Sequence, residues 1–426
     1  MAKQHRIVIV GGGAGGLELA TQLGQHIGKK KHIQITLVDT SLTHIWKPLL
    51  HEIAAGTLNA ASEEINYFAH AKKHHYKFQL GYLSSIDREQ QEIVLSPLMQ
   101  GNVQLADERR IGYDTLVLAI GSTSNDFATP GAQQYCHFLD NRTQADTFQR
   151  DLLNLYLQAH AQPREQPLNI TIIGAGATGV ELAAELHQAA QDFHRYGLDG
   201  IDPNKVKINI IEAAERILPA LSDKVAQGAL QQLHKYGINV FTQHKVEKID
   251  DTHVYCQNGQ IFAANLKVWA AGIKAPSVTQ NFGLTLDRIG RIKVYATLQS
   301  VDDPNIFAFG DCAHCQPIAN QPVLAPRAQV ASQQADFLVN AIVRKIKNQP
   351  ITMFKFNDKG SLVSLTQNGA IGELLGNIHV EGLLAKTMYH SLYRLHQANI
   401  LGYTRAGLLT ARDLFGKGTA PLVKLH

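Results

Sequence analysis

Two glycine-rich segments with the same surroundings constrain this chain more than any other feature of its sequence. They are residues 11–16 (GGGAGG), which follow the apolar run 6–10, and residues 174–179 (GAGATG), which follow 169–173. Each has the spacing G-x-G-x-x-G between an expected strand and an expected helix, the fingerprint of a dinucleotide-binding βαβ unit. One such match is weak, but two in the same context predict that the chain binds two dinucleotides and passes electrons between two cofactors.

The glycines of each fingerprint have separate physical tasks. In the first, Gly11 permits the tight turn, Gly13 lets the backbone approach a pyrophosphate, and Gly16 lets the helix pack close to the strand. The phosphates then lie on free N–H groups at the positive end of the helix. The residues predicted to bind the two nucleotides are Gly11, Gly13, Ala14, Gly15 and Gly16 in the first unit and Gly174, Gly176 and Gly179 in the second.

A carboxylate closes the second strand of each unit. Asp39 follows the apolar run 33–38, and Glu212 follows 208–211. A carboxylate in this place accepts hydrogen bonds from the ribose hydroxyls of an adenosine, and it repels a 2′-phosphate. We therefore expect the second unit to prefer NAD(H) to NADP(H), with Arg216 as the one nearby cation that opposes this preference.

Asp311, after the apolar strand 306–309 and Gly310, is a third signal. A carboxylate at a strand end beside a first nucleotide fold binds the ribityl hydroxyls of a flavin, although an aspartate also serves commonly as a helix N-cap. Because the chain also has two nucleotide units and the turn from Ala119 to Gly121, we favour flavin binding by Asp311 over a helix N-cap. The sequence thus predicts an α/β protein with two Rossmann-like folds, FAD on the first and a nicotinamide on the second.

Composition limits the remaining possibilities. A chain of 426 residues is too long for one core, so two or three domains are expected. The net charge of +4, without a basic stripe interleaved with aromatics, argues against nucleic-acid binding. No apolar run is long enough to predict a spanning helix, and the first strand begins too early to leave room for a signal peptide. Four cysteines make no disulfide framework, which favours a reducing, cytosolic compartment.

Three domains follow from the order of the expected elements. We expect a discontinuous FAD-binding domain at 1–160 and 286–350, an NADH-binding domain at 161–285, and a C-terminal domain at 351–426. The polar helix 142–161 leads into the second βαβ unit, and a helix from about Pro326 to Lys347 follows the flavin aspartate.

Four segments, 11–19, 46–52, 174–182 and 325–334, resemble the type II NADH:quinone oxidoreductases, single-subunit NADH dehydrogenases of the two-dinucleotide-binding-domain flavoproteins. The resemblance covers nearly the whole chain, and the pattern A-Q-x-A-x-Q at 328–333 is its most particular part. It implies that NADH delivers hydride to the flavin, that a membrane quinone then takes two electrons, and that no protons are pumped.

The resemblance also implies roles for individual residues. Glu181, expected in the first helical turn, lies near both rings in the family, and Gln329 and Gln333 line its quinone site. On residues alone, the glutamines read as solvent-facing, Glu181 as a favourable acid at a helix start, and Lys359 as a turn lysine. The residues implied in catalysis are Glu181, Gln329, Gln333 and Lys359. Those implied in FAD binding, besides the first fingerprint, are Asp39, Lys47, Ala119, Gly121, Asp311, Ala328 and Gln329, and those in NADH binding, besides the second, are Glu181, Glu212 and Gly272.

The C-terminal segment 381–426 is basic and amphipathic. It holds six Lys or Arg and two Asp or Glu. An apolar stripe recurs at helical spacing, with Lys386 off the stripe, and a second apolar stretch lies at 400–415; the stripe is Leu384, Met388, Leu392 and Leu395. Such a segment lies in a membrane interface or packs on the protein's own core or on a dimer partner. Quinone access favours the membrane, so we expect a peripheral protein on the cytoplasmic face of the plasma (inner) membrane; a homodimer stays open.

The cysteines separate the alternatives. None lies between residues 1 and 135, so a redox-active pair near the first unit, and with it a disulfide reductase, is not expected. A sulfide:quinone oxidoreductase would have to hold sulfur on Cys136, Cys312 or Cys315, which read better as structural thiols than as a metal or redox pair. A soluble NADH-dependent ferredoxin or rubredoxin reductase is the third possibility.

Overall fold

The structure, a computed structural model, describes residues 4–162, 166–198, 200–318, 321–366, 369–374, 378–416 and 423. The chain divides into two compact units, and each is described by itself. The first unit contains 1–46, 63–123 and 274–357, and the second contains 47–62, 124–273 and 358–426.

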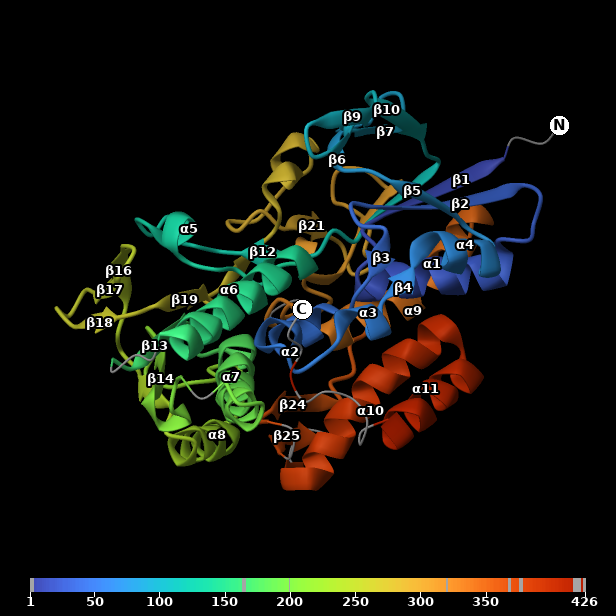
Figure 1. The fold of residues 1–426 in the computed structure, drawn as a ribbon. Helices are drawn as coiled ribbons and strands as arrows, with labels where there is room; N and C mark the ends of the chain where they lie inside the picture. Colours follow the sequence, from blue (N-terminus) through green and yellow to red (C-terminus); the bar gives the residue numbers. More distant parts are fainter. Residues whose placement is uncertain are drawn as a thin grey trace. The chain divides into compact units, whose positions relative to one another are not determined.

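The first unit is built on a parallel five-stranded sheet of order β22-β11-β1-β2-β5 (Figure 1). The strands are β1 (His5–Val10), β2 (Ile33–Asp39), β5 (Lys77–Leu80), β11 (Thr115–Leu118) and β22 (Ile306–Ala308). The run 7–10 is fully buried, as expected for a parallel strand that is covered on both faces. Two helices, α1 (Ala14–Ile27) and α9 (Ala328–Ile346), pack on one another, and the Ser332 hydroxyl donates to Glu18 at 2.6 Å.

Smaller elements surround this sheet. The antiparallel sheet β10-β7-β6 comprises β6 (Leu83–Asp87), β7 (Glu92–Leu95) and β10 (Arg109–Gly112), and α4 (Tyr67–Lys73) leads into β5.

The second unit repeats the nucleotide-fold plan with a parallel sheet of order β15-β14-β13-β19. Its strands are β13 (Leu168–Ile173), β14 (Val206–Ile211), β15 (Asn239–Phe241) and β19 (Leu266–Trp269), and its helices are α2 (Leu50–Ala55), α6 (Arg142–Ala161), α7 (Ala177–Arg195) and α8 (Asp223–Lys235). Side-chain caps start two helices: Asn141 accepts from the Gln144 N–H, and Ser222 from the Val225 N–H.

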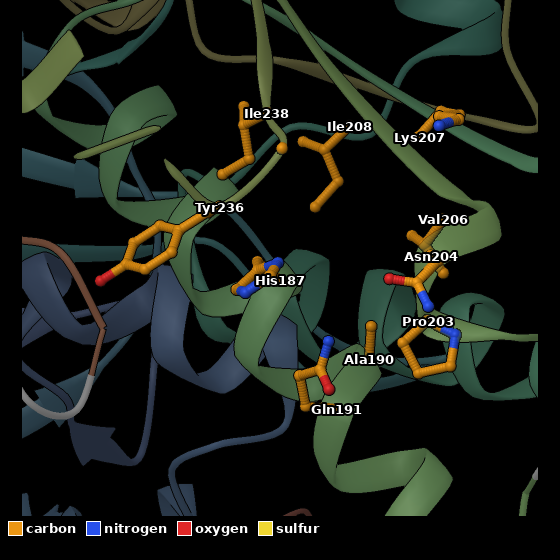
Figure 2. Close-up of a pocket in the computed structure, with 11 residues that line it drawn as sticks. His187, Ala190, Gln191, Pro203, Asn204, Val206, Lys207, Ile208, Tyr236 and Ile238 are labelled. Atoms are coloured by element: carbon orange, nitrogen blue, oxygen red, sulfur yellow. The ribbon is translucent and has the colours of Figure 1, made fainter. Parts of the chain in front are cut away.

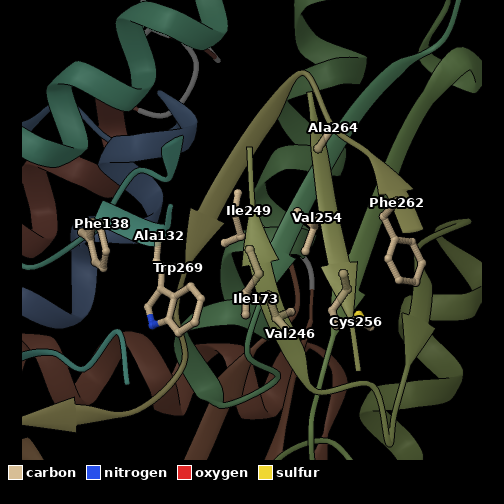
Figure 3. Close-up of a cluster of buried hydrophobic side chains, with 11 residues drawn as sticks. Ala132, Phe138, Ile173, Val246, Ile249, Val254, Cys256, Phe262, Ala264 and Trp269 are labelled. Carbon is tan, nitrogen blue, oxygen red and sulfur yellow. The ribbon is translucent and has the colours of Figure 1, made fainter. Parts of the chain in front are cut away.

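One apolar core of the second unit joins its parallel sheet to an antiparallel one (Figure 3). Trp269 and Ile173 meet side chains of β16 (Val246–Ile249), β17 (His253–Cys256) and β18 (Ile261–Ala263). The Trp269 indole N–H is satisfied by the Asn125 and Ala271 carbonyls, so burial leaves no unpaired donor there.

The C-terminal part of the second unit comprises a small sheet and two helices. The sheet is β24 (Gly360–Ser364), β25 (Ala370–Leu374) and β26 (Ile378–Glu381), and the helices are α10 (Gly382–Leu401) and α11 (Tyr403–Gly416). α10 packs against all three strands, and Figure 1 shows both helices in red. Of the basic segment expected at 381–426, residues 417–422 and 424–426 lie outside the described part.

Most expected elements are confirmed, including the helix at 142–161 and both βαβ units. Two positions were wrong. α9 begins at Ala328, because Arg327 has the extended backbone of an N-cap residue, so Pro326 lies before the helix. α7 begins at Ala177, ahead of the last fingerprint glycine, so Glu181 is the fifth helical residue and lies beyond the first turn. Within the described ranges, no helix combines the length and apolarity needed to cross a bilayer.

Candidate active site

The first glycine loop leaves room for a ligand at one position only. A Cβ on Gly16 would lie 1.8 Å from the Gly11 carbonyl oxygen, and one on Gly11 would lie 2.3 Å from the Ala119 carbonyl oxygen. Both glycines are therefore required by the fold itself. Gly13 is the N-cap residue of α1, and a Cβ on it would meet nothing within 4 Å. The open space beside the N–H groups of the helix start fits a pyrophosphate.

The second loop repeats this pattern. A Cβ on Gly179 would lie 2.0 Å from the Gly174 carbonyl oxygen, and one on Gly174 would lie 2.7 Å from the Ala271 backbone. Gly176, which caps α7, again has open space on its Cβ side. Each unit therefore has a cradle of the same construction at the start of a helix, as the two fingerprints predicted.

The two strand-end carboxylates hold their glycine loops. The Gly12 N–H donates to Asp39 Oδ2 at 2.6 Å, and in the second unit the Ala175 N–H donates to Glu212 Oε2 at 2.7 Å. The other oxygens accept from Ser41 N–H at 2.8 Å and from Ala214 N–H at 2.8 Å. Burial raises the pKa of Asp39, against the lowering effect of these N–H groups. Sequence reasoning assigned these side chains to ribose alone, whereas they also fix the loop that receives the phosphates.

Arg216 is not available to bind a 2′-phosphate. Its guanidinium donates to the carbonyls of Leu218, Pro219 and Leu221 and forms an ion pair with Asp223 at 3.2 Å. A phosphate would have to compete with all four partners. This geometry supports NADH over NADPH.

In the first unit, the two turns that were predicted to contact a flavin are tied together. The Ser122 hydroxyl, next to the turn that ends at Gly121, donates to Asp311 Oδ2 at 2.8 Å. The Gly310 N–H donates to the side-chain oxygen of Gln334 at 2.8 Å, and Gln334 is only 1% exposed. Sequence reasoning missed Gln334. The glutamine doublet at 333–334 was a signal, because neighbouring helical residues point to different faces.

Gln329 and Gln333 lie on one face of α9, as expected from their spacing. Both are half-buried. The Gln333 amide exchanges two hydrogen bonds with the Asn357 backbone, at 2.8 and 3.0 Å. This amide is therefore held in a fixed orientation, while Ala328 begins the helix beside them.

Three further predicted residues, Lys47, Gly272 and Lys359, belong to the second unit. Lys47 lies 3.7 Å from Asp140, and Lys359 is exposed just before β24. Gly272 has φ +64°, and its carbonyl accepts from the Asn125 N–H at 3.1 Å.

Glu181 lies in a buried cluster of ionisable groups. Its Oε1 accepts from the Ser364 N–H at 3.0 Å, and its Oε2 lies 3.7 Å from Nδ1 of His51. Burial, reinforced by the negative charge of Glu52, raises the pKa of Glu181 to about 8. Burial also lowers the pKa of His51 to about 3, so this imidazole is neutral at physiological pH. The cluster therefore holds a protonated carboxyl at neutral pH.

Lys386 is the cation of this cluster. The sequence placed it off the apolar stripe of the C-terminal segment but did not predict its burial: Lys386 is 4% exposed and donates to the Ser364 hydroxyl at 2.7 Å. Its ammonium also lies 5.4 Å from the ring centroid of Tyr389. Glu185, which accepts from Thr57 at 2.7 Å, is the further buried carboxyl, and burial raises its pKa. Only the packing of α10 on β24 shows that Lys386 lies beside Ser364 in this cluster.

The cysteines that follow Asp311 are neutral thiols. Burial raises the pKa of Cys312 and of Cys315 to about 12, so both are neutral thiols. The Cys312 thiol contacts the Leu118 carbonyl at 3.5 Å inside the first unit. Cys136, in the second unit, has a pKa raised by burial to about 12 as well. None of the three has the thiolate that sulfur chemistry requires.

A cavity of about 120 Å³ lies in the second unit between α7, the start of β14 and the end of α8 (Figure 2). His187 stacks on Tyr236 at its wall, with ring centroids 4.9 Å apart. The glycine loop and Glu212 lie at the other end of β14. The cavity is thus separate from the predicted nucleotide site.

Comparisons with known proteins agree with this geometry. The sequence profile of the family described as pyridine nucleotide-disulphide oxidoreductase matches residues 5–335. The type II NADH:quinone oxidoreductase of Haemophilus influenzae is 41% identical over 442 aligned positions, which cover 99% of this chain and 99% of that protein.

Two solved structures show the same fold. NDH2 from Plasmodium falciparum in complex with NADH has a TM-score of 0.85 at 20% identity, covering 99% of this chain and 100% of that one. The sulfide:quinone oxidoreductase from Aquifex aeolicus has a TM-score of 0.75 at 19% identity, covering 96% and 95%. The fold is therefore shared by enzymes with different electron donors, and the side chains of the site have to separate them.

Proposed function

Because this chain belongs to the type II NADH:quinone oxidoreductase family, we propose that it oxidises NADH and reduces a membrane-dissolved quinone through FAD. The observation that carries the proposal is the pair of matching cradles. In both units the outer fingerprint glycines contact backbone, the middle one faces open space, and a strand-end carboxylate holds the loop. The chain is thus built for two dinucleotides.

The two cradles are assigned by their surroundings. FAD, when bound, supplies a carrier that accepts hydride and passes electrons on. We assign it to 1–160 and 286–350, held by the first fingerprint, Asp39, Lys47, the turn 119–121, Asp311, Ala328 and Gln329. NADH is assigned to 161–285, held by the second fingerprint, Glu181, Glu212 and Gly272. The engaged guanidinium of Arg216 supports NADH here.

Reduction of a quinone to a quinol consumes two protons, and the buried cluster offers one. Glu181 holds a proton at neutral pH, because its carboxyl is buried among other acids. Its Oε1 bonds to the Ser364 N–H, and the hydroxyl of the same serine accepts from Lys386. We assign to Glu181 the task of holding and releasing this proton, to Gln329 and Gln333 the lining of the quinone site, and to Lys359 a position near the flavin.

Helix α10 supports attachment to a membrane through its exposed apolar side. Leu384 is 63% exposed, and Leu392 and Leu395 are each 47% exposed. The opposite side of the helix is buried and includes Lys386 and Tyr389. An apolar stripe that stays exposed on a helix whose opposite side is already packed suits a lipid interface. We therefore propose peripheral attachment to the cytoplasmic face of the plasma membrane through 381–416.

Attachment is tested by sedimentation with lipid vesicles. Replacing Leu384 and Leu392 by Gln should release the protein, whereas Leu157→Gln, which changes a leucine 46% exposed on α6, should not. Deletion of the whole tail would be a poor test, because it removes Lys386 from the core. Equal pelleting of all three proteins would contradict the proposal.

Activity is tested under anaerobic conditions with the purified flavoprotein. NADH should bleach the flavin absorbance at once, NADPH much more slowly, and a short-chain quinone should restore the colour. Bleaching by sulfide but not by NADH would replace this proposal with the sulfide:quinone reaction. The neutral, buried Cys312 and Cys315 argue against that outcome. A soluble ferredoxin or rubredoxin reductase would instead show no vesicle binding and no quinone turnover.

A further inference from the structure

The first unit also carries a basic surface. It is formed by segments 24–34 and 66–79, which together contain six lysines and no arginine, aspartate or glutamate. The lysines are Lys29, Lys30, Lys31, Lys72, Lys73 and Lys77. Their charge exceeds the +4 of the whole chain, so the rest of the molecule is net negative. We call these two segments the lysine patch.

Close backbone packing brings the two segments together. A Cβ on Gly24 would lie 1.9 Å from the His74 carbonyl oxygen, and one on Gly28 would lie 2.3 Å from that of His75. The Gln25 amide also hydrogen-bonds to the His74 ring at 3.0 Å. The last turn of α1 therefore lies on the chain that follows α4, and Figure 1 shows these two helices in blue beside one another. Glycine at both contacts keeps the segments this close.

The lysines of the patch face solvent without counter-ions. All six are exposed, and Lys77 donates to Gln34 at 2.9 Å. Among the described residues, none of the other five has an ion-pair partner. The carboxyl ends of α1 and α4 offset some of this charge, but two helix ends supply only about one unit together. Most of the positive charge is therefore left for an external partner.

We propose that the lysine patch is a second membrane contact, which binds the anionic headgroups of a bilayer. The inference rests on the proposed attachment of the enzyme to a membrane. Lysine provides point charges suited to a fluid surface, whereas recognition of a nucleic acid favours arginine, and the patch contains none. Phe68, 54% exposed on α4, adds an apolar side chain that can enter the interface.

The test measures partition of the full-length holoenzyme onto vesicles of phosphatidylcholine with and without phosphatidylglycerol. Each lysine near an anionic surface strengthens binding about five-fold. The double variant Lys30→Glu with Lys72→Glu should therefore bind anionic vesicles at least about 25-fold more weakly. It should bind neutral vesicles as the wild type does, because the apolar stripe of α10 is intact. High salt should abolish the difference.

The matched control is Lys224→Glu with Lys235→Glu, which changes net charge equally at two exposed lysines of α8. The milder Lys30→Gln with Lys72→Gln should give a smaller loss in the same direction, and flavin absorbance confirms that each variant is folded. If the patch and control variants lose equal affinity, the effect is one of net charge and the inference is overturned.

Two further results would also overturn the inference. One is unchanged vesicle binding by the patch variant. The other is patch-dependent binding of a nucleic-acid duplex without patch-dependent vesicle binding. Failure of the proposed function would give a different result. The wild type would then show no quinone turnover, or it would bind neither neutral nor anionic vesicles.

Discussion

From the raised pKa of Glu181 we predict how the free energy of unfolding depends on pH. With its pKa raised from 4.5 to about 8, the folded protein holds a proton here between these two values that the unfolded chain has released. The stability that this proton supplies is complete below pH 4.5 and is lost as pH rises towards 8. The slope is about 1.4 kcal/mol per pH unit, and the total is roughly 5 kcal/mol.

The variant Glu181→Gln carries a neutral group of the same shape at every pH, so it lacks this loss. The free energy of unfolding of the variant minus that of the wild type should rise by about 1.4 kcal/mol per pH unit from pH 5 to 8 and stay level above it. Denaturant unfolding at fixed protein concentration measures this difference, since other titrating groups cancel between the two proteins.

Glu247→Gln, which changes an exposed carboxylate on β16, supplies the baseline. Parallel stability curves for Glu181→Gln and the wild type would show that this carboxyl titrates alike in the folded and unfolded chains. The cluster would then hold no proton at neutral pH, and the assigned role of Glu181 in quinone reduction would fall with it.

Three further predictions concern the nucleotide sites. Gly13→Ala should give a folded protein without bound FAD, because the added Cβ would occupy the space proposed for the ligand, whereas Gly16→Ala should fail to fold. Flavin absorbance and circular dichroism distinguish the two variants, and FAD retained by Gly13→Ala would contradict the proposed pyrophosphate site. Gln334→Leu leaves the Gly310 N–H without its acceptor, so it should lower the free energy of unfolding by about 1–3 kcal/mol and release FAD at a lower temperature. An unchanged melting curve would contradict this expectation. Glu212→Ala should lower kcat/KM for NADH about tenfold or more, while Arg216→Ala should leave the NADH-to-NADPH ratio unchanged; a shifted ratio in the latter would show a role in cofactor choice.

The sequence was sufficient for the features whose causes are local. Gly16 must avoid the carbonyl of Gly11, five residues earlier, and both glycines belong to one six-residue fingerprint that can be recognised in the sequence. The carboxylates Asp39 and Glu212 were found in the same way, because a strand end is readable from the apolar run before it. The role that sequence reasoning missed for them, holding the loop N–H groups, depends on the distance between two strands.

Features with tertiary causes were not readable. The glutamine doublet at 333–334 indicates that the two side chains point to different faces of α9, but only the approach of the turn at Gly310 shows that Gln334 is the buried one. The start of α7 was misplaced because the last fingerprint glycine lies inside the helix, which shifts Glu181 into its second turn. Burial of that carboxyl depends on β24, nearly two hundred residues further along the chain, so no local pattern could predict its proton.

Helix α10 shows why an amphipathic pattern does not by itself tell which face is buried. Apolar residues at helical spacing ordinarily mark the face that packs on a core. Here the three leucines of that stripe are exposed, and the buried side of the helix combines apolar and aromatic residues with Lys386, His396 and Gln397. Burying a lysine is costly unless it is paired, and Lys386 gains Ser364 and the nearby acids in return. The packing of the Lys386 side of α10 completes the Glu181 cluster, and it leaves the leucines on the exposed side of the helix. A helix that builds the acid cluster with one face and meets lipid with the other would link attachment to the membrane with the proton chemistry of the quinone.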